Sequence, residues 1–155
     1  MQQYFPHTKQ EGSFVWEDEL RFDFAADKLL TNEEIDAITQ SINQQIQQAY
    51  TVQTQTMAYD AAVQMWAKAF FADTYGAEAR VVSIAQEWQS QQFLSLELCG
   101  WNHVQNTSDI WAFVIMRQEA VASWVKRLQA YTWPRILEKI KQDDVILSSL
   151  IQSLS

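Results

Sequence analysis

The sequence predicts an α+β fold of two layers, in which helices cover a largely antiparallel sheet. Two observations predict it. Short segments such as Leu20–Phe24 and Phe93–Leu98 alternate apolar and polar residues, the pattern of half-buried strands. Two longer segments, after Thr31 and after Pro134, instead space their apolar residues at helical intervals. Because sheets and helices each bury one apolar face, packing one on the other gives two layers.

The first third of the chain is expected to hold two strands and a helix. Phe14–Val15 and Leu20–Phe24 indicate strands joined by an acidic turn at residues 17–19. Thr31 and Glu34 form a capping box, because a threonine at the N-cap and a glutamate three residues later satisfy each other's backbone N–H groups. The helix that follows has its apolar positions at Ile35, Ile38, Ile42, Ile46 and Ala49.

The remaining elements follow the same two patterns. We expect a short helix over residues 60–71, and the alternating segments predict strands over 50–57, 80–84, 93–98, 110–116 and 122–131. Asn106–Asp109 reads as a polar turn. Pro134 suits the first turn of a C-terminal helix. The apolar side of that helix is predicted at Ile136, Leu137, Ile140, Val145, Ile146 and Leu150.

Composition narrows the classes of protein to consider. A single cysteine excludes an internal disulfide and fits a reducing compartment. The chain has no signal-like apolar run at its start and no stretch long enough to span a membrane, so we expect a cytoplasmic protein without membrane contact. A net charge of −8 argues against independent binding to DNA or RNA. Lys126-Arg127 could touch an RNA backbone or simply be solvated.

The segment Ser95–Val104 carries the residues with the clearest chemical potential. It holds the only cysteine, Cys99, and one of the two histidines, His103. Thiolate and imidazole are common zinc ligands. On a fully extended strand the two residues would lie about 13 Å apart, so one ion could bind both only if residues 100–102 bend. Without a metal, Cys99 is predicted to be a half-buried thiol rather than a nucleophile, because no basic neighbour in the sequence favours its thiolate.

The same segment carries a resemblance to a known family. Glu97-Leu98-Cys99-Gly100-x-x-His103-Val104, followed by Thr107-x-x-Ile110-x-x-Phe113, resembles the E-L-C-G-G-T-H-V signature, the Thr and the I-G-x-F of the alanyl-tRNA synthetase editing domain. The related threonyl-tRNA synthetase domain usually has Arg and Pro at the positions of Gly100 and Asn102, so the alanyl type is preferred. Further similar segments occur in family order at residues 10–13, 20–24, 67–76, 80–84 and 125–132, so that the resemblance covers residues 10–135.

The resemblance implies an aminoacyl-tRNA deacylase that hydrolyses tRNA(Ala) wrongly charged with serine or glycine. It implies zinc, held by a His-x3-His on an early helix together with Cys99 and His103. Gln10 matches a glutamine that lines the family's pocket as a neutral hydrogen-bonding group. The implied partner is the acceptor end of tRNA(Ala), bound with the help of other domains. Residues 1–135 would form the editing domain, and 136–155 a helix leading toward the next region.

The chain departs from the family pattern in its histidines. The early His-x3-His is missing, and the other histidine, His7, has neither the position nor the spacing to replace it and is read as a surface residue. We therefore expect an N-terminally truncated editing domain that supplies two of four zinc ligands and is inactive in isolation. Two alternatives remain: a non-catalytic binding or assembly module that retains the editing fold, and an unrelated α+β domain. Glu97 is a further candidate, as a general base.

A second departure concerns glycine. The chain has three glycines and seven tryptophans, whereas average glycine usage would give roughly eleven. Five tryptophans fall where the family pattern has glycine, and exchanging glycine for tryptophan is severe where the backbone needs a positive φ. One hypothesis is that UGA codons, which some bacteria read as glycine, have been translated as tryptophan. The alternative is that all five are true core residues: Trp66, Trp101, Trp111, Trp124 and Trp133.

Overall fold

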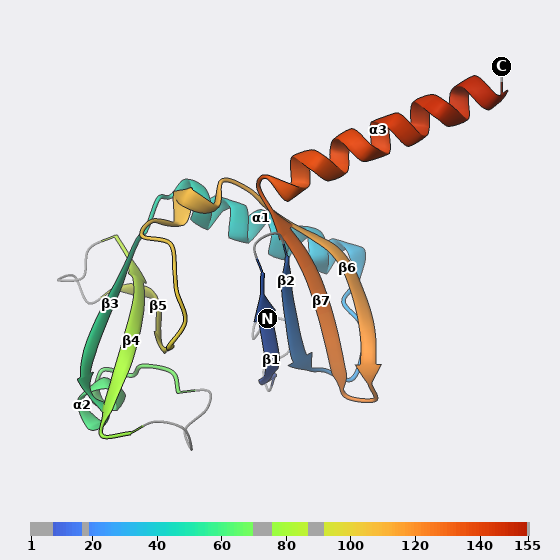
Figure 1. Cartoon of the computed structure of the whole chain (residues 1–155). Coiled ribbons are helices and arrows are strands. Elements are labelled where there is room, and N and C mark those ends of the chain that lie inside the picture. Colours follow the sequence, from blue (N-terminus) through green and yellow to red (C-terminus); the bar gives the residue numbers. More distant parts are fainter. Residues whose placement is uncertain (1–7, 17–18, 70–75, 87–91, 155) are drawn as a thin grey trace. The chain divides into compact units, whose positions relative to one another are not determined.

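The computed structural model describes residues 8–16, 19–69, 76–86 and 92–154, and these have an α+β fold (Figure 1). The predicted fold class is confirmed, including the antiparallel pairing and the C-terminal helix. In chain order the helices and strands are β1 (Gln10–Val15), β2 (Leu20–Ala25), α1 (Asn32–Gln47), β3 (Thr51–Ala58), α2 (Tyr59–Gln64), β4 (Glu78–Ala85), β5 (Phe93–Leu98), β6 (Phe113–Ala122), β7 (Val125–Thr132) and α3 (Arg135–Leu154).

The strands divide into two sheets, where the sequence had led us to expect one. A four-stranded sheet has the order β1-β2-β7-β6, and a three-stranded sheet has the order β3-β4-β5. Residues 1–43 and 111–155 form one compact unit, called unit 1 here, and residues 44–110 form unit 2. The expectation of a single sheet was wrong because alternation identifies strands without saying which of them pair.

Unit 1 is built on the four-stranded sheet and most of α1. Phe24 on β2 and Leu128 on β7 are buried in its core, and Ile38 of α1 joins them. Ile35 and Ile42, spaced along the same face of the helix, pack against this core as the sequence predicted. The amphipathic pattern of α1 thus covers one face of the sheet.

Two side chains fix α1 in place. The capping box is confirmed: the Glu34 backbone N–H donates to Thr31 Oγ1 at 3.2 Å, and the Thr31 N–H donates to Glu34 Oε2 at 2.8 Å. Further along, the Asn43 side-chain amide pairs with the backbone of Phe113 at the start of β6. It donates to the Phe113 carbonyl at 2.7 Å and accepts from the Phe113 N–H at 2.9 Å.

Unit 2 is built on the three-stranded sheet and α2. Val81 on β4, Leu98 on β5 and Ala62 on α2 are buried together in a second hydrophobic core. Thr107, in a short 3₁₀ helix at Thr107–Ile110, is also buried. Its hydroxyl accepts from the Tyr50 N–H at 2.9 Å and donates to the Gln45 carbonyl at 3.0 Å. Thr107 therefore connects three segments of unit 2 and has a structural role.

Several boundaries differ from the sequence-based expectation. The first strand begins earlier, at Gln10, and residue 110 belongs to the 3₁₀ helix rather than to β6. The predicted helix over 60–71 ends at Gln64, and residues 70–75 lie outside the described part. The C-terminal helix forms as predicted, but much of its apolar side is exposed, at Ile140, Val145, Ile146, Leu147 and Ile151. In the part of the chain that is described, no helix has the length and apolar character to cross a membrane.

Candidate metal-ligand segment in unit 2

The β4–β5 pair positions the Cys-x3-His segment. Leu98, the last residue of β5, pairs with Val81, and the ladder continues for one more bond, from the Cys99 N–H to the Arg80 carbonyl at 3.1 Å. On its other side, β5 is bonded to the backbone of Lys68, which accepts from the Leu98 N–H and donates to the Leu96 carbonyl, both at 2.9 Å. Backbone bonds on both sides therefore hold the strand that leads into Cys99.

The backbone leaves the strand after Leu98 and bends at Trp101. From the sequence, one ion could bind both Cys99 and His103 only if the backbone bends among residues 100–102, and it does bend there. Cys99 is half-buried with a free thiol, as predicted. His103 is exposed, so its imidazole is accessible. The segment therefore has the bend that the sequence analysis required, and pairing of the two ligands stays a prediction.

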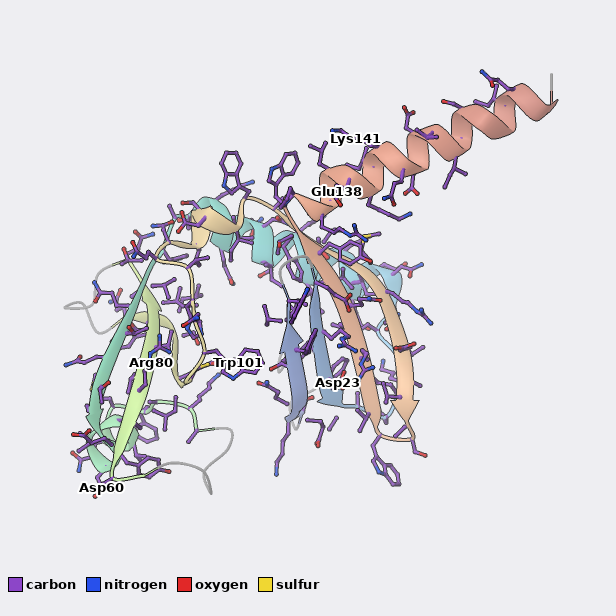
Figure 2. All side chains as sticks on the ribbon, viewed as in Figure 1. Asp23, Asp60, Arg80, Trp101, Glu138 and Lys141 are labelled. Carbon is purple, nitrogen blue, oxygen red and sulfur yellow. The ribbon has the colours of Figure 1, made fainter. Side chains whose placement is uncertain are left out.

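Arg80 holds this bend. Its Nη1 donates to the Cys99 carbonyl at 2.8 Å and to the Trp101 carbonyl at 2.6 Å. Arg80 and Trp101 are both labelled in Figure 2. A guanidinium is planar and permanently charged, and bonds to charged donors are stronger than neutral ones. The sequence reasoning missed this role of Arg80. Arg80 lies 19 residues before Cys99 in the sequence. The sequence alone does not show that an arginine on one strand hydrogen-bonds the backbone of a residue so distant in the chain.

The surroundings of His103 favour its neutral form. Although His103 is exposed, nearby protein atoms exclude part of the water around its imidazole, and this desolvation lowers the pKa of His103. The positive charge of Arg80 acts in the same direction. A hydrogen bond with the Trp101 backbone and the negative charge of Glu97 oppose this, without reversing it. Neutral imidazole is the form that binds a metal.

Glu97, the candidate general base, is half-buried on β5. Its Oε1 accepts a hydrogen bond from Ser95 Oγ at 2.7 Å. The two side chains are two residues apart and therefore share one face of the strand. The carboxylate thus has a hydroxyl partner, and its charge reaches His103.

Gln10 is the first residue of β1 and belongs to unit 1, whereas Cys99 and His103 belong to unit 2. A register shift between Gln10 and Gly12 interrupts the pairing of β1 with β2. The Gln10 side-chain amide donates to Ser13 Oγ at 2.9 Å. The shared pocket that the resemblance implies for Gln10 would need residues of both units, and it stays a prediction. His7 lies outside the described residues.

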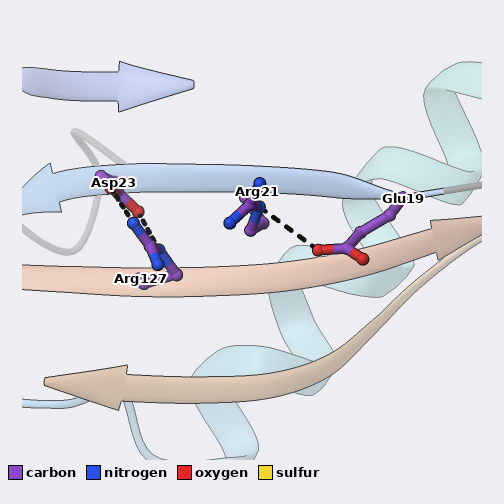
Figure 3. A network of polar contacts seen from close by, with 4 residues as sticks. All are labelled: Glu19, Arg21, Asp23 and Arg127. Atoms are coloured by element: carbon purple, nitrogen blue, oxygen red, sulfur yellow. Dashed lines mark hydrogen bonds and ion pairs between the residues drawn. The ribbon is translucent and has the colours of Figure 1, made fainter. Parts of the chain in front are cut away.

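Lys126 and Arg127, considered above as contacts for RNA, both have partners within unit 1. Lys126 is buried, with 4% of its surface exposed, and its Nζ donates to the Ser123 carbonyl at 2.8 Å. Arg127 makes two parallel bonds of 2.7 Å to the Asp23 carboxylate on the neighbouring strand (Figure 3). Because the Asp23 carboxylate accepts these bonds, it raises the pKa of Arg127 above its usual value. Lys126 is therefore not a solvated surface residue, and Arg127 reads as a structural cation.

The five tryptophans at glycine positions are not core residues. Their exposed fractions are 89% for Trp66, 50% for Trp101, 73% for Trp111, 74% for Trp124 and 42% for Trp133. Their interpretation as true core tryptophans was therefore wrong. Trp66 and Trp111 also have positive φ angles, 62° and 64°.

The donor chemistry of Cys99 and His103 suits zinc, which binds sulfur and nitrogen ligands. Within the described ranges, no group of three or more His, Cys, Asp or Glu side chains could hold a metal ion. Unit 2 thus offers one thiol and one imidazole on a bent, hydrogen-bonded segment. Any further ligands would have to come from other parts of the protein.

Comparisons with known proteins agree with the resemblance. The family described as threonyl and alanyl tRNA synthetase second additional domain matches residues 79–129, from β4 into β7. Alanine--tRNA ligases from Paramagnetospirillum magneticum and Dinoroseobacter shibae are 39% and 38% identical to the chain, and the ligase from Rickettsia felis is 36% identical. Each alignment covers 96% of the chain, but the chain spans only 16–17% of these ligases' own length. Residues 79–129 therefore match the family described as threonyl and alanyl tRNA synthetase second additional domain, and nearly the whole chain is similar to one part of alanine--tRNA ligases.

Proposed function

We propose that this chain is part of the editing domain of an alanine--tRNA ligase and contributes two ligands to its zinc site. The proposed reaction is hydrolysis of the ester that links serine or glycine to tRNA(Ala). The observation that carries the proposal is the bent segment Cys99–His103, which lies inside the matched residues and presents a free thiol and an exposed imidazole.

The residues divide the work as follows. Cys99 and His103 would bind zinc together with two histidines from outside this chain. Bound zinc would supply a Lewis acid and a site that organises water near the ester carbonyl. Gln10 would line the pocket and hydrogen-bond the substrate without adding charge. Glu97 is a carboxylate whose charge acts on His103, and it would be the candidate to accept a proton from water.

The partner would be the acceptor end of tRNA(Ala), with much of the binding energy coming from other domains. The chain has a net charge of −8, and phosphate binding needs an excess of basic residues. Arg127 is paired with a carboxylate and Lys126 is buried against carbonyl groups. Contacts to the tRNA backbone from this chain alone would therefore be few.

The test uses an extended chain, in which a His-x3-His segment from an alanine--tRNA ligase precedes the 155 residues. We expect the extended chain to bind about one zinc ion and to deacylate Ser-tRNA(Ala), while correctly charged Ala-tRNA(Ala) is largely spared. The variants Cys99→Ser and His103→Ala should bind zinc more weakly and lose deacylation, and Ser108→Ala, an exposed residue of the same unit, should keep both. An extended chain that folds but shows neither zinc nor deacylation would instead identify a non-catalytic module that retains the fold.

A further inference from the structure

We propose that Arg80 is a positioning residue that holds Cys99 and His103 as a ligand pair. The proposal deepens the proposed function and rests on it. Three hydrogen bonds join residue 80 to the segment: two from the guanidinium, to the carbonyls of Cys99 and Trp101, and one from the Cys99 N–H to the Arg80 carbonyl. They bracket the point at which the chain leaves β5 and bends.

The position of Arg80 makes it a firm anchor. It lies on β4, the central strand of its sheet, between the buried residues Ala79 and Val81. The guanidinium therefore projects from a packed part of unit 2 to a segment that has no regular secondary structure. Fixing ligands before a metal arrives lowers the entropic cost of binding, and residues that orient ligands typically change metal affinity 10–100-fold.

The direct test measures Co²⁺ affinity in the extended chain defined above. We expect Arg80→Gln to raise the Kd for Co²⁺ roughly 10–100-fold and to weaken the thiolate-to-cobalt charge-transfer band. Arg80→Lys keeps a charged donor but lacks the planar guanidinium. Its Kd for Co²⁺ should therefore lie between those of the wild-type chain and Arg80→Gln. Arg117→Gln is the matched control, because Arg117 lies on β6 in unit 1 with 67% of its side chain exposed.

A second measurement separates this proposal from the proposed function. In the metal-free 155-residue chain, Arg80→Gln should speed amide hydrogen exchange at residues 99–103 while leaving β7 unchanged. Unaltered exchange, or an unaltered Kd and spectrum in a wild-type chain that binds Co²⁺, would overturn the positioning role. If the extended wild-type chain binds no Co²⁺ at all, the proposed function is wrong, and the exchange comparison still decides whether Arg80 holds the segment.

A different observation carries a second proposal: the geometry points to glycine at positions 66 and 111 in the protein that the cell makes. Trp66 directly follows the C-cap of α2. The Trp66 N–H donates to the Val63 carbonyl at 2.9 Å, and the Ala67 N–H donates to the Ala62 carbonyl at 3.1 Å. These two bonds define a Schellman motif, in which the residue at the position of Trp66 adopts left-handed backbone and is usually glycine.

Trp111 also has a left-handed backbone conformation directly after a helix. It follows the 3₁₀ helix Thr107–Ile110 and has a φ of 64°. A bulky aromatic residue at positive φ is unfavourable. Burial does not offset that cost, because 89% of Trp66 and 73% of Trp111 is exposed. Among the described residues other than glycine, the one further positive φ belongs to Ala49, a small residue after α1. A UGA codon read as glycine accounts for both positions and for part of the shortage of glycine.

Two experiments test the assignment. The first reads the codons and the mass of the peptides that span residues 66 and 111 in protein from the native cells; UGA codons and glycine masses are expected. The second compares Trp66→Gly with Trp66→Ala, which differ in their tolerance of positive φ. We expect the glycine variant to have the higher Tm, by about 2–4 °C, with no such difference between the same two variants at Trp124. UGG codons, or tryptophan in the native peptides, would overturn the proposal.

Discussion

The Arg80 side chain donates a hydrogen bond of 2.8 Å to the Cys99 carbonyl, and the Cys99 N–H donates one of 3.1 Å to the Arg80 carbonyl. The first residue of the Cys-x3-His segment is thus attached to β4 by both its N–H and its C=O. Since Cys99 still continues the β4–β5 ladder, its amide hydrogen should exchange more slowly than that of the exposed Asn102. Hydrogen exchange resolved by NMR measures this, and equal rates would mean that the ladder ends before Cys99.

The capping box of α1 gives a stability prediction. Replacing Thr31 by Ala removes the acceptor for the Glu34 N–H and should lower the free energy of unfolding by about 1 kcal/mol. Thr31→Ser keeps a hydroxyl in reach and is the matched control, which should stay within a few tenths of the wild-type value. Urea denaturation measures both. A Thr31→Ala variant as stable as Thr31→Ser would mean that the cap contributes nothing.

The side-chain amide of Asn43 hydrogen-bonds both the N–H and the C=O of Phe113, as a neighbouring strand would. Asn43→Ala leaves both the N–H and the C=O of Phe113 without this partner, so we expect a loss of roughly 2 kcal/mol in unfolding free energy. Asn43→Asp can still accept from the N–H, but its carboxylate repels the carbonyl, so it should also destabilise. Gln40→Ala, at an exposed position on the same helix, should be nearly neutral.

The ion pair between Asp23 and Arg127 can be tested by a double-mutant cycle. The two side chains make parallel bonds across β2 and β7, with 20% and 28% of their surfaces exposed. Asp23→Asn and Arg127→Gln should each lower Tm, and the double variant should lose less than the sum of the two, because the second change removes a partner already lost. Strictly additive losses would show that the pair is not coupled.

Local signals in the sequence were sufficient for the elements and for part of the site. The capping box located the start of α1, and the alternation from Phe93 to Leu98 located β5 to the residue. Cys99 was expected to be half-buried, and it is. These features depend on neighbours within a few residues, which is the range over which hydrophobic period and capping chemistry act.

Contacts between residues far apart in the sequence could not be predicted from these local signals. The bond between Asn43 and Phe113 joins residues 70 apart, and that between Arg80 and Cys99 joins residues 19 apart. Lys126 looked like a solvated strand residue, yet its side chain folds back onto the turn carbonyls of its own hairpin and is buried. The partition of the strands into two sheets likewise depends on pairing, which a single sequence does not specify.

X-ray absorption at the zinc edge of the extended chain tests the central claim most directly, because it counts the atoms bound to the metal. The account predicts one sulfur at about 2.3 Å and three nitrogens at about 2.0–2.1 Å, with the sulfur lost in Cys99→Ser and one nitrogen lost in His103→Ala. A zinc shell without sulfur, or one that neither substitution changes, would contradict it.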